Sequence, residues 1–278
     1  MNRTARIAIN LGSWIAITAY LVVASRYCSS RRDETLCNRI QVTVKDSARQ
    51  AIITPAMVRL WIENGPTPVR NQPVRSVDTR AIERDIRSRG FVREARVYTE
   101  ATGRLVVELS QRRPVARINT ANGYNCYLTD DGYVLPLQRH FVVYVPIITG
   151  NFEPPFARDY VGSVGELPAE TKKKLAKNYL FFSKLISFVK FLGEDSFWNA
   201  QIEQINVVPA LQGSVSQDYN VELTPRAGDH TILLGELDEY HDKLGKLLGF
   251  YRNGLEYEGW HTYRYIDLRF RGQVICRK

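Results

Sequence analysis

The longest apolar run in the chain lies close to its N-terminus. Residues 5–24 read ARIAINLGSWIAITAYLVVA, and only Arg6 and Asn10 interrupt the apolar and small residues. About 20 helical residues, each rising about 1.5 Å, span a hydrocarbon core of about 30 Å. The pattern predicts a transmembrane helix at residues 7–25, preceded by a short tail at residues 1–6.

The nature and orientation of this segment rest on weaker features. Val22 and Ala24 suit positions −3 and −1 of a signal-peptide cleavage site, but the run is long for a signal peptide, which favours an uncleaved anchor. The arginines on its two sides nearly balance, so charge does not fix the orientation. A tail of six residues before the first apolar segment favours a cytoplasmic N-terminus and export of the chain beyond the anchor.

A second patterned region, residues 38–114, follows a polar linker at residues 26–37. Residues 40–44, IQVTV, alternate between apolar and polar side chains, which predicts a strand. The Thr54-Pro55 pair is typical of an N-cap followed by the first helical position. We therefore expect a helix that begins there and ends at Gly65.

A second helix and two strands complete this region. Asp78 is a typical N-cap for the segment TRAIERDIRSR, which is expected to end with Gly90 as its C′ glycine. Residues 91–99 and 104–110 alternate as strands around a glycine turn. Met57, Leu60 and Trp61 are expected to share one face of the first helix, with Trp61 in the core. The other residues expected in the core are Ile82, Ile86, Ala95, Val97, Leu105, Val107 and Leu109. The order strand, helix, helix, strand, strand predicts a small α+β unit.

Residues 115–278 read mostly as short strands separated by turns. Asp130-Asp131-Gly132 is a hairpin signal between the strands YNCYLT and YVLPL, and FVVYVPIIT is a further strand region. Strands return at IEQINVV, YNVELT and HTILLG, and a last strand is expected at residues 265–271. Apolar stripes predict two helices, at about 169–192 and 237–251. The pattern indicates a mostly antiparallel β domain with two helices.

Charge is distributed unevenly between these two regions. Residues 31–113 carry 17 basic and 10 acidic side chains, whereas residues 114–278 carry 18 basic and 19 acidic ones. A basic module near a membrane can be drawn to anionic head groups, at about 1 kcal/mol for each nearby Lys or Arg. A solvated arginine-rich surface is the alternative, and the pattern does not decide between lipid and protein as its partner. No nucleic-acid recognition fold accompanies the basic residues, so nucleic acid is not expected.

The sequence shows no pattern typical of an enzyme or a metal site. It lacks GxSxG, a glycine-rich phosphate loop and HExxH. Its four cysteines form no CxxC pair, so a zinc site is not expected, although Cys28 and Cys37 are close enough to form a disulfide after export. Cys126 and Cys276 lie in strand-like runs and are expected to be small buried hydrophobic residues. We predict that the chain is not an enzyme and holds no cofactor or metal.

Two regions of the chain resemble the two domains of a known family. FVREARVYTEATGRLVVELSQRRPVARI resembles the end of a POTRA domain, with Gln111, Arg112 and Pro114 in its closing motif. The segments that resemble the β domain of the FtsQ/DivIB family then come in the same order, at residues 127–136, 146–150, 222–225, 232–235 and 266–270. POTRA-type chaperones that assemble outer-membrane proteins are the alternative, but these continue into a large barrel, for which the 164 residues after Pro114 are too few.

The resemblance implies a role in bacterial cell division rather than a reaction. FtsQ-like proteins are single-pass proteins of the inner membrane, with most of the chain in the periplasm, enriched at the division site. They hold FtsB-like and FtsL-like coiled-coil proteins. The basic region at 38–114 is expected to contact other membrane-embedded division proteins. A third hypothesis, an envelope enzyme acting on peptidoglycan, requires a cleft with a convergent nucleophile or metal.

The resemblance also implies a binding site at the C-terminus. In the family, the last strand of the β domain lies at the sheet edge and accepts a partner segment by strand addition, which maps to residues 265–274 here. An edge strand offers unpaired N–H and C=O groups that a partner strand can complete. The family's aromatic contact corresponds to Phe270, which simple alternation buries with Leu268 unless Gly272 allows a bulge. The predicted partner-binding residues are Tyr265, Asp267, Leu268, Arg269, Phe270, Arg271, Gln273 and Val274.

Overall fold

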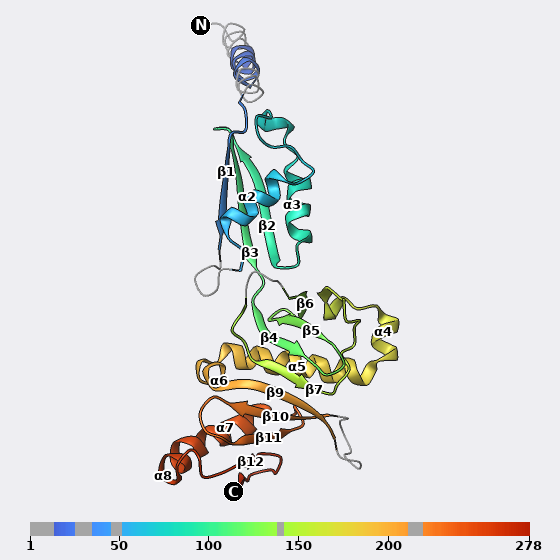
Figure 1. Ribbon diagram of the computed structural model, residues 1–278. Helices are drawn as coiled ribbons and strands as arrows, with labels where there is room; N and C mark the ends of the chain where they lie inside the picture. The colour runs from blue at the N-terminus through green and yellow to red at the C-terminus, as the bar shows by residue number, and fades with distance from the viewer. Residues whose placement is uncertain (1–13, 26–34, 46–51, 138–141, 211–218) are drawn as a thin grey trace, which may run out of the picture. The chain divides into compact units, whose positions relative to one another are not determined.

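The computed structural model describes residues 14–25, 35–45, 52–137, 142–210 and 219–278. The chain divides into two compact units, which we call unit 1, Met1–Gln111, and unit 2, Arg112–Lys278. Each unit is described by itself (Figure 1).

Residues 14–25 are helical, and their apolar side chains are exposed. Trp14 is 68% exposed and Tyr20 is 72% exposed. Within the part of the chain that the structure describes, no helix is both long and apolar enough to cross a bilayer. The predicted tail at 1–6 and the start of the predicted anchor at 7–25 lie outside the described residues.

The two helices that follow in unit 1 begin at their predicted caps. Helix α2 spans Pro55–Glu63, and the Thr54 hydroxyl accepts a hydrogen bond from an amide of its first turn at 3.3 Å. Helix α3 spans Thr79–Ser88, and the Asp78 carboxylate accepts a similar bond at 3.0 Å. Because the first-turn amides of a helix lack intrahelical partners, each cap stabilises its helix by about 1 kcal/mol. A short 3₁₀ turn, Val74–Ser76, precedes α3.

The buried face of α2 differs from the prediction. Val58 and Ile62, four residues apart, are the buried side chains of this helix. Leu60 is 55% exposed, and Met57 and Trp61 are half-buried at the margin of the packed face. The prediction that Met57, Leu60 and Trp61 share a core face is therefore wrong, because the face centred on Val58 and Ile62 packs inward.

The buried face of α3 is the predicted one, but the end of this helix is not. Ile82 and Ile86 are buried as expected. The helix ends at Ser88, and Arg89 is already extended, with φ −79° and ψ 113°. Gly90 does not adopt the positive φ of a C′ glycine. The chain runs straight into the next strand, so no left-handed reversal is needed.

The sheet of unit 1 has three strands in the order β1-β3-β2. Their bounds are Arg39–Val44 for β1, Val92–Glu100 for β2 and Arg104–Gln111 for β3. Strand β3 runs parallel to β1 and antiparallel to β2. The five strand residues predicted for the core are all buried: Ala95, Val97, Leu105, Val107 and Leu109. The predicted β-α-α-β-β order is confirmed.

Unit 2 is built on a ten-stranded sheet in the order β13-β12-β11-β10-β9-β7-β4-β5-β6-β8. The bounds are β4 Pro114–Asn119, β5 Asn125–Thr129, β6 Tyr133–Pro136, β7 Ile147–Gly150, β8 Gly162–Ser163, β9 Ile202–Pro209, β10 Tyr219–Pro225, β11 Thr231–Gly235, β12 Tyr265–Asp267 and β13 Ile275–Arg277. Neighbours are antiparallel except for the pairs β4/β7, β7/β9 and β11/β12. The prediction of a mostly antiparallel sheet is confirmed.

One predicted strand of unit 2 is shorter than expected. The run FVVYVPIIT forms a strand only from Ile147, because Pro146 has no N–H to donate to a ladder. Its carbonyl still accepts a hydrogen bond from Arg117 N–H at 2.9 Å. Val143 is buried before this strand, where its N–H donates to the Tyr127 hydroxyl at 3.2 Å.

The helices of unit 2 are more divided than predicted. Their bounds are α4 Ala169–Lys174, α5 Ala176–Glu194, α6 Ser196–Gln201, α7 Tyr240–Phe250 and α8 Glu256–Glu258, with a 3₁₀ turn at Val164–Glu166 and a π-helical turn, η3, at Tyr251–Leu255. The single helix expected at 169–192 is interrupted at Leu175, whose ψ is 37°. The Leu175 N–H still donates to Thr171 O, so the chain bends without losing that bond.

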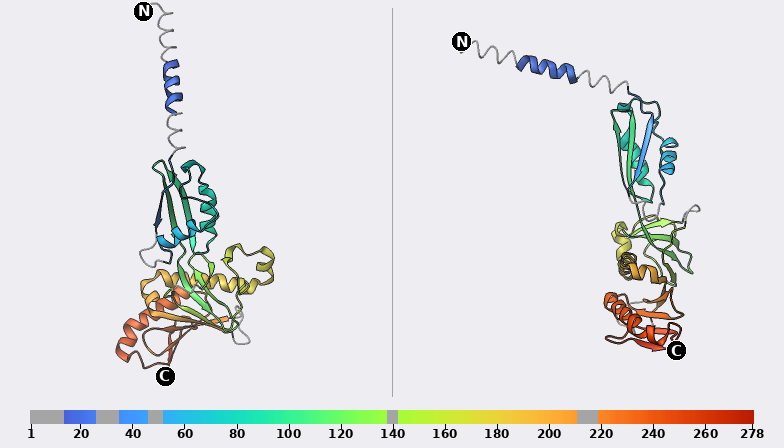
Figure 2. Two further views of the ribbon diagram at one scale, coloured as in Figure 1. Left: turned by 45° about the horizontal axis from the view of Figure 1, so that its top comes forward. Right: turned by 90° about the vertical axis from the view of Figure 1, so that its left-hand side faces the viewer.

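Helix α5 covers one face of the unit 2 sheet and supplies much of its core. The views in Figure 1 and Figure 2 place this helix along the strands. Phe182, Leu185 and Phe188 on the helix are fully buried with strand residues such as Ile205 and Val221. Each such side chain contributes about 1.5–3 kcal/mol on burial. Packing against α5 therefore stabilises the sheet that carries the C-terminal hairpin.

Candidate partner-binding site

The C-terminal edge of the unit 2 sheet is a hairpin, not a single strand. Strand β12 ends at Asp267, and β13 pairs with it antiparallel on the side away from β11. The prediction of one strand at 265–271 that forms the sheet edge is therefore wrong. The edge belongs to β13, Ile275–Arg277.

The buried carboxylate of Asp267 ends β12. One carboxylate oxygen accepts a hydrogen bond from the Arg269 backbone N–H at 3.1 Å. The same oxygen accepts from Arg269 Nε at 2.9 Å, and the other accepts from Arg269 Nη2 at 2.6 Å. An Asp side chain that binds the amide two residues on turns the backbone out of the extended form. The alternation of side chains along this segment therefore stops before Arg269.

Asp267 is charged within the fold although it is fully buried. Burial by itself raises the pKa of Asp267, but the hydrogen bonds and the positive charge of Arg269 outweigh burial and hold this pKa below its ordinary value. The ion pair ties the end of β12 to the turn that follows. It also explains why an acidic residue can occupy an interior position.

Gly235, at the end of β11, makes room for the Arg269 side chain. Its φ is +74°, and a Cβ there would lie 2.7 Å from Cγ of Arg269. Leu268, between the two ion-paired residues, is fully buried, and its N–H donates to Leu233 O at 3.0 Å. The hairpin is therefore seated on β11 by packing and by backbone bonds.

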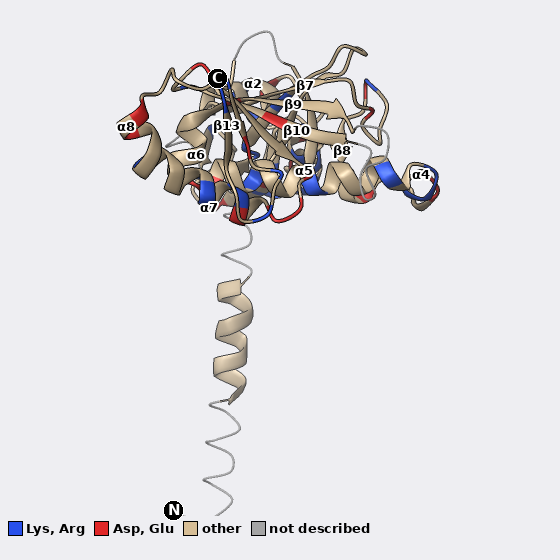
Figure 3. Cartoon of the chain, turned by 90° about the horizontal axis from the view of Figure 1, so that it is seen from below, with Lys and Arg blue, Asp and Glu red and all other residues tan. Residues whose placement is uncertain are grey.

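The turn between β12 and β13 carries the exposed side chains of the site. Phe270 is 46% exposed, and its carbonyl accepts a hydrogen bond from Lys246 Nζ at 3.2 Å; basic positions along α7 are visible in Figure 3. Arg271 is paired with Glu239 at 2.7 Å. Gly272 has a φ of +72° and belongs to this turn rather than to a strand bulge. Phe270 is exposed because the chain has left the strand before reaching it.

The backbone of Cys276 points to the open edge. Just outside β12, the Leu268 N–H donates to Leu233 O and Arg264 O accepts from Thr231 N–H, so Ile266 between them bonds toward β11, while the Arg264 N–H donates to Arg277 O in β13 at 2.9 Å. The odd-numbered residues therefore bond toward β13, where Tyr265 faces Arg277 and Asp267 faces Ile275. Because successive strand residues point their backbone groups to opposite sides, the N–H and C=O of Cys276 face away from the sheet.

The predicted site residues thus separate into three groups. The residues Tyr265, Arg269, Phe270, Arg271 and Gln273 are exposed at the hairpin. The side chains of Asp267 and Leu268 are buried within the chain, and Val274 is half-buried against the core. Sequence reasoning missed β13 as the edge, although the apolar run Val274-Ile-Cys276 after Gly272 is a short strand signal.

A buried histidine lies directly before β11, at the opposite end of this strand from Gly235. His230 is 2% exposed, and its Nε2 lies 2.8 Å from the hydroxyl of Tyr251 in η3. Burial lowers the pKa of His230 and raises the pKa of Tyr251, so both groups are neutral at pH 7. This contact is structural, since it joins a strand to the turn after α7.

The other candidate chemical groups have ordinary roles in the fold. Gly132, with φ +71°, closes the predicted turn after Asp130-Asp131, and burial raises the pKa of Cys126 to about 12. His261 is hydrogen-bonded to Asp229 at 2.8 Å. Among the residues that the structure describes, no group of His, Cys, Asp and Glu could hold a metal ion. Cys28 and His140 lie outside these residues.

The chain is similar to known division proteins over both units. A family model described as "FtsQ/DivIB, C-terminal related" matches residues 113–277, more than half of the chain. A POTRA-like domain model matches residues 35–110. Cell division protein FtsQ of Geotalea daltonii is 28% identical over 242 residues, which are 86% of this chain and 74% of that protein. With this match over the C-terminal unit, the chain belongs to the FtsQ/DivIB family.

Proposed function

We propose that this chain is a scaffold of the bacterial division machinery that holds small coiled-coil membrane proteins, of the FtsB and FtsL kind, at the open edge of β13. The family membership supports a role in cell division. The observation that carries the binding mode is the side of β13, at the end of a ten-stranded sheet, with which no described strand pairs. A scaffold of this kind acts through binding to these and other division membrane proteins and needs no reaction.

Strand addition at β13 fits the chemistry of the hairpin. The N–H and C=O of Cys276 give a partner segment a starting pair of hydrogen bonds, and backbone pairing supplies affinity in this mode. Tyr265 and Phe270, each 46% exposed, flank the edge and can supply specificity. Asp267 and Leu268 support the hairpin from inside.

We also propose that residues 7–25 anchor the chain in the inner membrane, with residues 1–6 in the cytoplasm and both units in the periplasm. The helical residues 14–25 expose apolar side chains, including Ile15, Leu21 and Val23, that water solvates poorly. A reporter that is active only after export, fused behind Lys278, tests this topology. A reporter that stays inactive although the fusion protein is present in the cells would contradict it.

The experiment for the binding mode compares two substitutions at one edge position. Cys276→Pro removes the outward N–H, whereas Cys276→Ala keeps it and removes the same thiol. Proline is tolerated on the open side of an edge strand, so both variants should fold. Each full-length variant is purified from cells that contain the FtsB-like partner, and the partner that copurifies is quantified.

The proposal expects partner capture by Cys276→Ala close to that of the natural chain and a loss of at least about tenfold for Cys276→Pro, since a missing interface hydrogen bond together with a misfit strand costs more than about 1.4 kcal/mol. Circular dichroism checks that both variants are folded. Equal capture by both folded variants would show that the partner binds elsewhere.

A further inference from the structure

A groove runs beside β1 in unit 1, between this strand and α2. It consists of two cavities, of about 470 Å³ and 430 Å³, that share Ile40, Glu63 and Arg70. Its inner wall is apolar, since Ile62 and Val69 line it and are buried. A continuous groove of this size accommodates several residues of an extended chain rather than a single ion.

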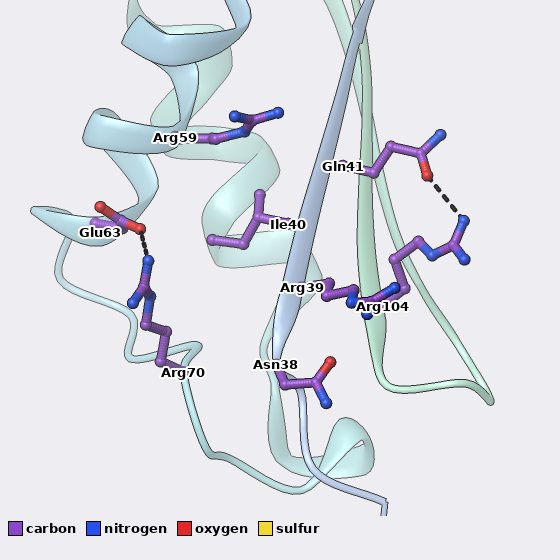
Figure 4. Close-up of a pocket in the computed structure, with 8 residues that line it drawn as sticks. All are labelled: Asn38, Arg39, Ile40, Gln41, Arg59, Glu63, Arg70 and Arg104. Carbon is purple, nitrogen blue, oxygen red and sulfur yellow. Dashed lines mark hydrogen bonds and ion pairs between the residues drawn. The ribbon is translucent and has the colours of Figure 1, made fainter.

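The groove follows the backbone edge of β1 rather than one face of the sheet. Four consecutive residues, 38–41, line it. Side chains of successive strand residues point to opposite faces, and in Figure 4 Ile40 points toward α2 while Gln41 points the other way. A cavity bordered by both faces must lie along the edge of the strand. Strand β3 pairs with the opposite side of β1, and no described strand pairs with this one.

The chain just before β1 already pairs on this side. The Cys37 N–H donates to Gln72 O at 2.8 Å, and Cys37 O accepts from Asn71 N–H at 2.9 Å. The next residue, Asn38, donates instead to Gly103 O at 3.0 Å, beside β3. Because successive residues point to opposite sides, residues 71–72 lie on the side away from β3. This pairing ends where β1 begins. Residues 71–72 therefore occupy the neighbouring strand position beside Cys37, and the groove extends this position along β1.

The rim of the groove is strongly basic. Arg39, Arg59, Arg70 and Arg104 line it, with Glu63 as its one acidic residue. Glu63 is paired with Arg70 at 2.5 Å, as drawn in Figure 4. Arg39 and Arg59 form no ion pair within the residues that the structure describes. Arg104 lies 3.6 Å from Glu100, so among the described residues two of the four arginines have no counter-charge beside the open strand edge.

The arginines lie on both sides of that edge. Arg39 and Arg104 are register partners on β1 and β3, so they share the face away from α2. Arg59 belongs to α2, and Arg70 follows it, so these two lie on the helix side. An added strand would have cations above and below it, so acidic side chains on either face of that strand would meet a positive charge.

We infer that this groove binds an extended acidic segment of a partner protein, which adds to β1 as a fourth strand of the unit 1 sheet. Backbone pairing uses the open edge, and the acidic side chains neutralise Arg39 and Arg59. An anionic lipid head group could meet the arginines, but it could not complete a row of N–H and C=O groups. This docking site is separate from β13 and goes beyond the binding proposed there.

The test uses the full-length chain in detergent solution and three labelled, blocked ten-residue peptides. The first alternates valine with glutamate, so all its glutamates lie on one face of the extended peptide. A shift of one residue in its pairing with β1 turns that face either toward Arg39 and Arg104 or toward Arg59 and Arg70. The second has glutamine in place of glutamate. The third is the first with N-methyl groups on its four central amides, which removes donors from both edges. Binding is measured by fluorescence anisotropy.

The inference expects the glutamate peptide to bind and the N-methylated peptide to lose binding. The glutamine peptide should bind about two- to thirtyfold more weakly, since it cannot form the exposed ion pairs with Arg39 and Arg59. The difference between the glutamate and glutamine peptides should shrink in high salt. Equal binding of all three peptides would overturn the inference.

Variants locate the site. The double variant Arg39→Gln/Arg59→Gln should weaken binding of the glutamate peptide, whereas Arg80→Gln/Arg84→Gln, which removes two exposed cations from α3, should leave it unchanged. Cys276→Pro should also leave it unchanged, so failure here is separable from failure of the proposed function. If no peptide binds but phosphatidylglycerol vesicles bind and lose affinity in Arg39→Gln/Arg59→Gln, the groove is a lipid site and the inference is wrong.

Discussion

Replacing Arg269 by alanine is the sharpest perturbation of the C-terminal hairpin. The change removes both side-chain hydrogen bonds to Asp267, at 2.9 Å and 2.6 Å, and leaves the bond from the backbone N–H at 3.1 Å. The Asp267 side chain is fully buried, so its charge loses most of its compensation. The ion pair thus makes Arg269 part of the fold as well as an exposed residue of the proposed site.

The size of the effect depends on the contacts that remain. Removing one partner of a buried ion pair costs about 3–5 kcal/mol when the other charge stays dry. Here the Arg269 side chain is 38% exposed, so water can enter the space that it leaves. The remaining backbone bond also solvates the carboxylate. We therefore expect the free energy of unfolding of unit 2 to fall by about 2–3 kcal/mol, close to the cost of lost hydrogen bonds to a charged group.

The assay is urea unfolding followed by tryptophan fluorescence, since Trp198 and Trp260 both lie in unit 2. Arg271→Ala is the matched control. It removes an arginine two residues away that is 88% exposed and paired with Glu239, so the loss of unfolding free energy should be much smaller. Equal losses for Arg269→Ala and Arg271→Ala would refute the reasoning.

The pH dependence of this loss has a defined sign. In the natural chain the pKa of Asp267 is depressed, so its stabilisation is present above the unfolded pKa of about 3.9 and is lost as pH falls through the folded pKa. Without Arg269, burial raises that pKa, and the penalty disappears as the carboxyl takes up a proton. The stability difference between natural chain and variant should therefore shrink between pH 7 and pH 4. A difference that grows on acidification would contradict the assigned ion pair.

Three further predictions test other parts of the fold by the same unfolding assay. Gly235→Ala should lower the free energy of unfolding by about 1–3 kcal/mol, because its φ is +74° and the new Cβ meets the Arg269 side chain; no change would contradict that contact. Burial lowers the pKa of His230, so the stability of the natural chain should fall as pH drops below about 6.5, the ordinary pKa of histidine. The variant His230→Gln should lose less stability than the natural chain between pH 7 and pH 5. Equal losses would show that His230 is not the cause. Ile86→Ala should destabilise unit 1 by about 2–5 kcal/mol, whereas Leu60→Ala, at an exposed position, should cost far less.

Local signals in the sequence predict the elements of both units well. Thr54 and Asp78 mark helix starts because their side chains satisfy amides that nothing else can reach. The alternation at 104–110 places Leu105, Val107 and Leu109 in the core because one face of that strand is buried. These features depend on neighbours along the chain, so the sequence alone reveals them.

One error has a local cause that alternation does not show, and the others arise where a distant residue decides the outcome. The pattern from 265 to 271 alternates without interruption, yet the Asp267 carboxylate captures the Arg269 amide and ends the strand. Whether β12 or β13 forms the edge depends on tertiary pairing, which alternation does not encode. The face of α2 is likewise set by the sheet beneath it, because Val58 and Ile62 pack inward and Leu60 does not. The basic groove beside β1 was not predictable, since it joins residues 38–41 with Arg59, Arg70 and Arg104.

The most direct test of the central claim, that a partner strand adds at β13, is hydrogen–deuterium exchange of the full-length chain with and without its purified FtsB-like partner. Strand addition should slow exchange in the peptide that covers residues 270–278, where the Cys276 amide faces the open edge. The peptide that covers residues 219–225 of β10, which is already paired on both sides, should not change. Slower exchange at residues 270–278 alone is the predicted result. Partner binding that leaves this segment unchanged and protects another surface would contradict the account.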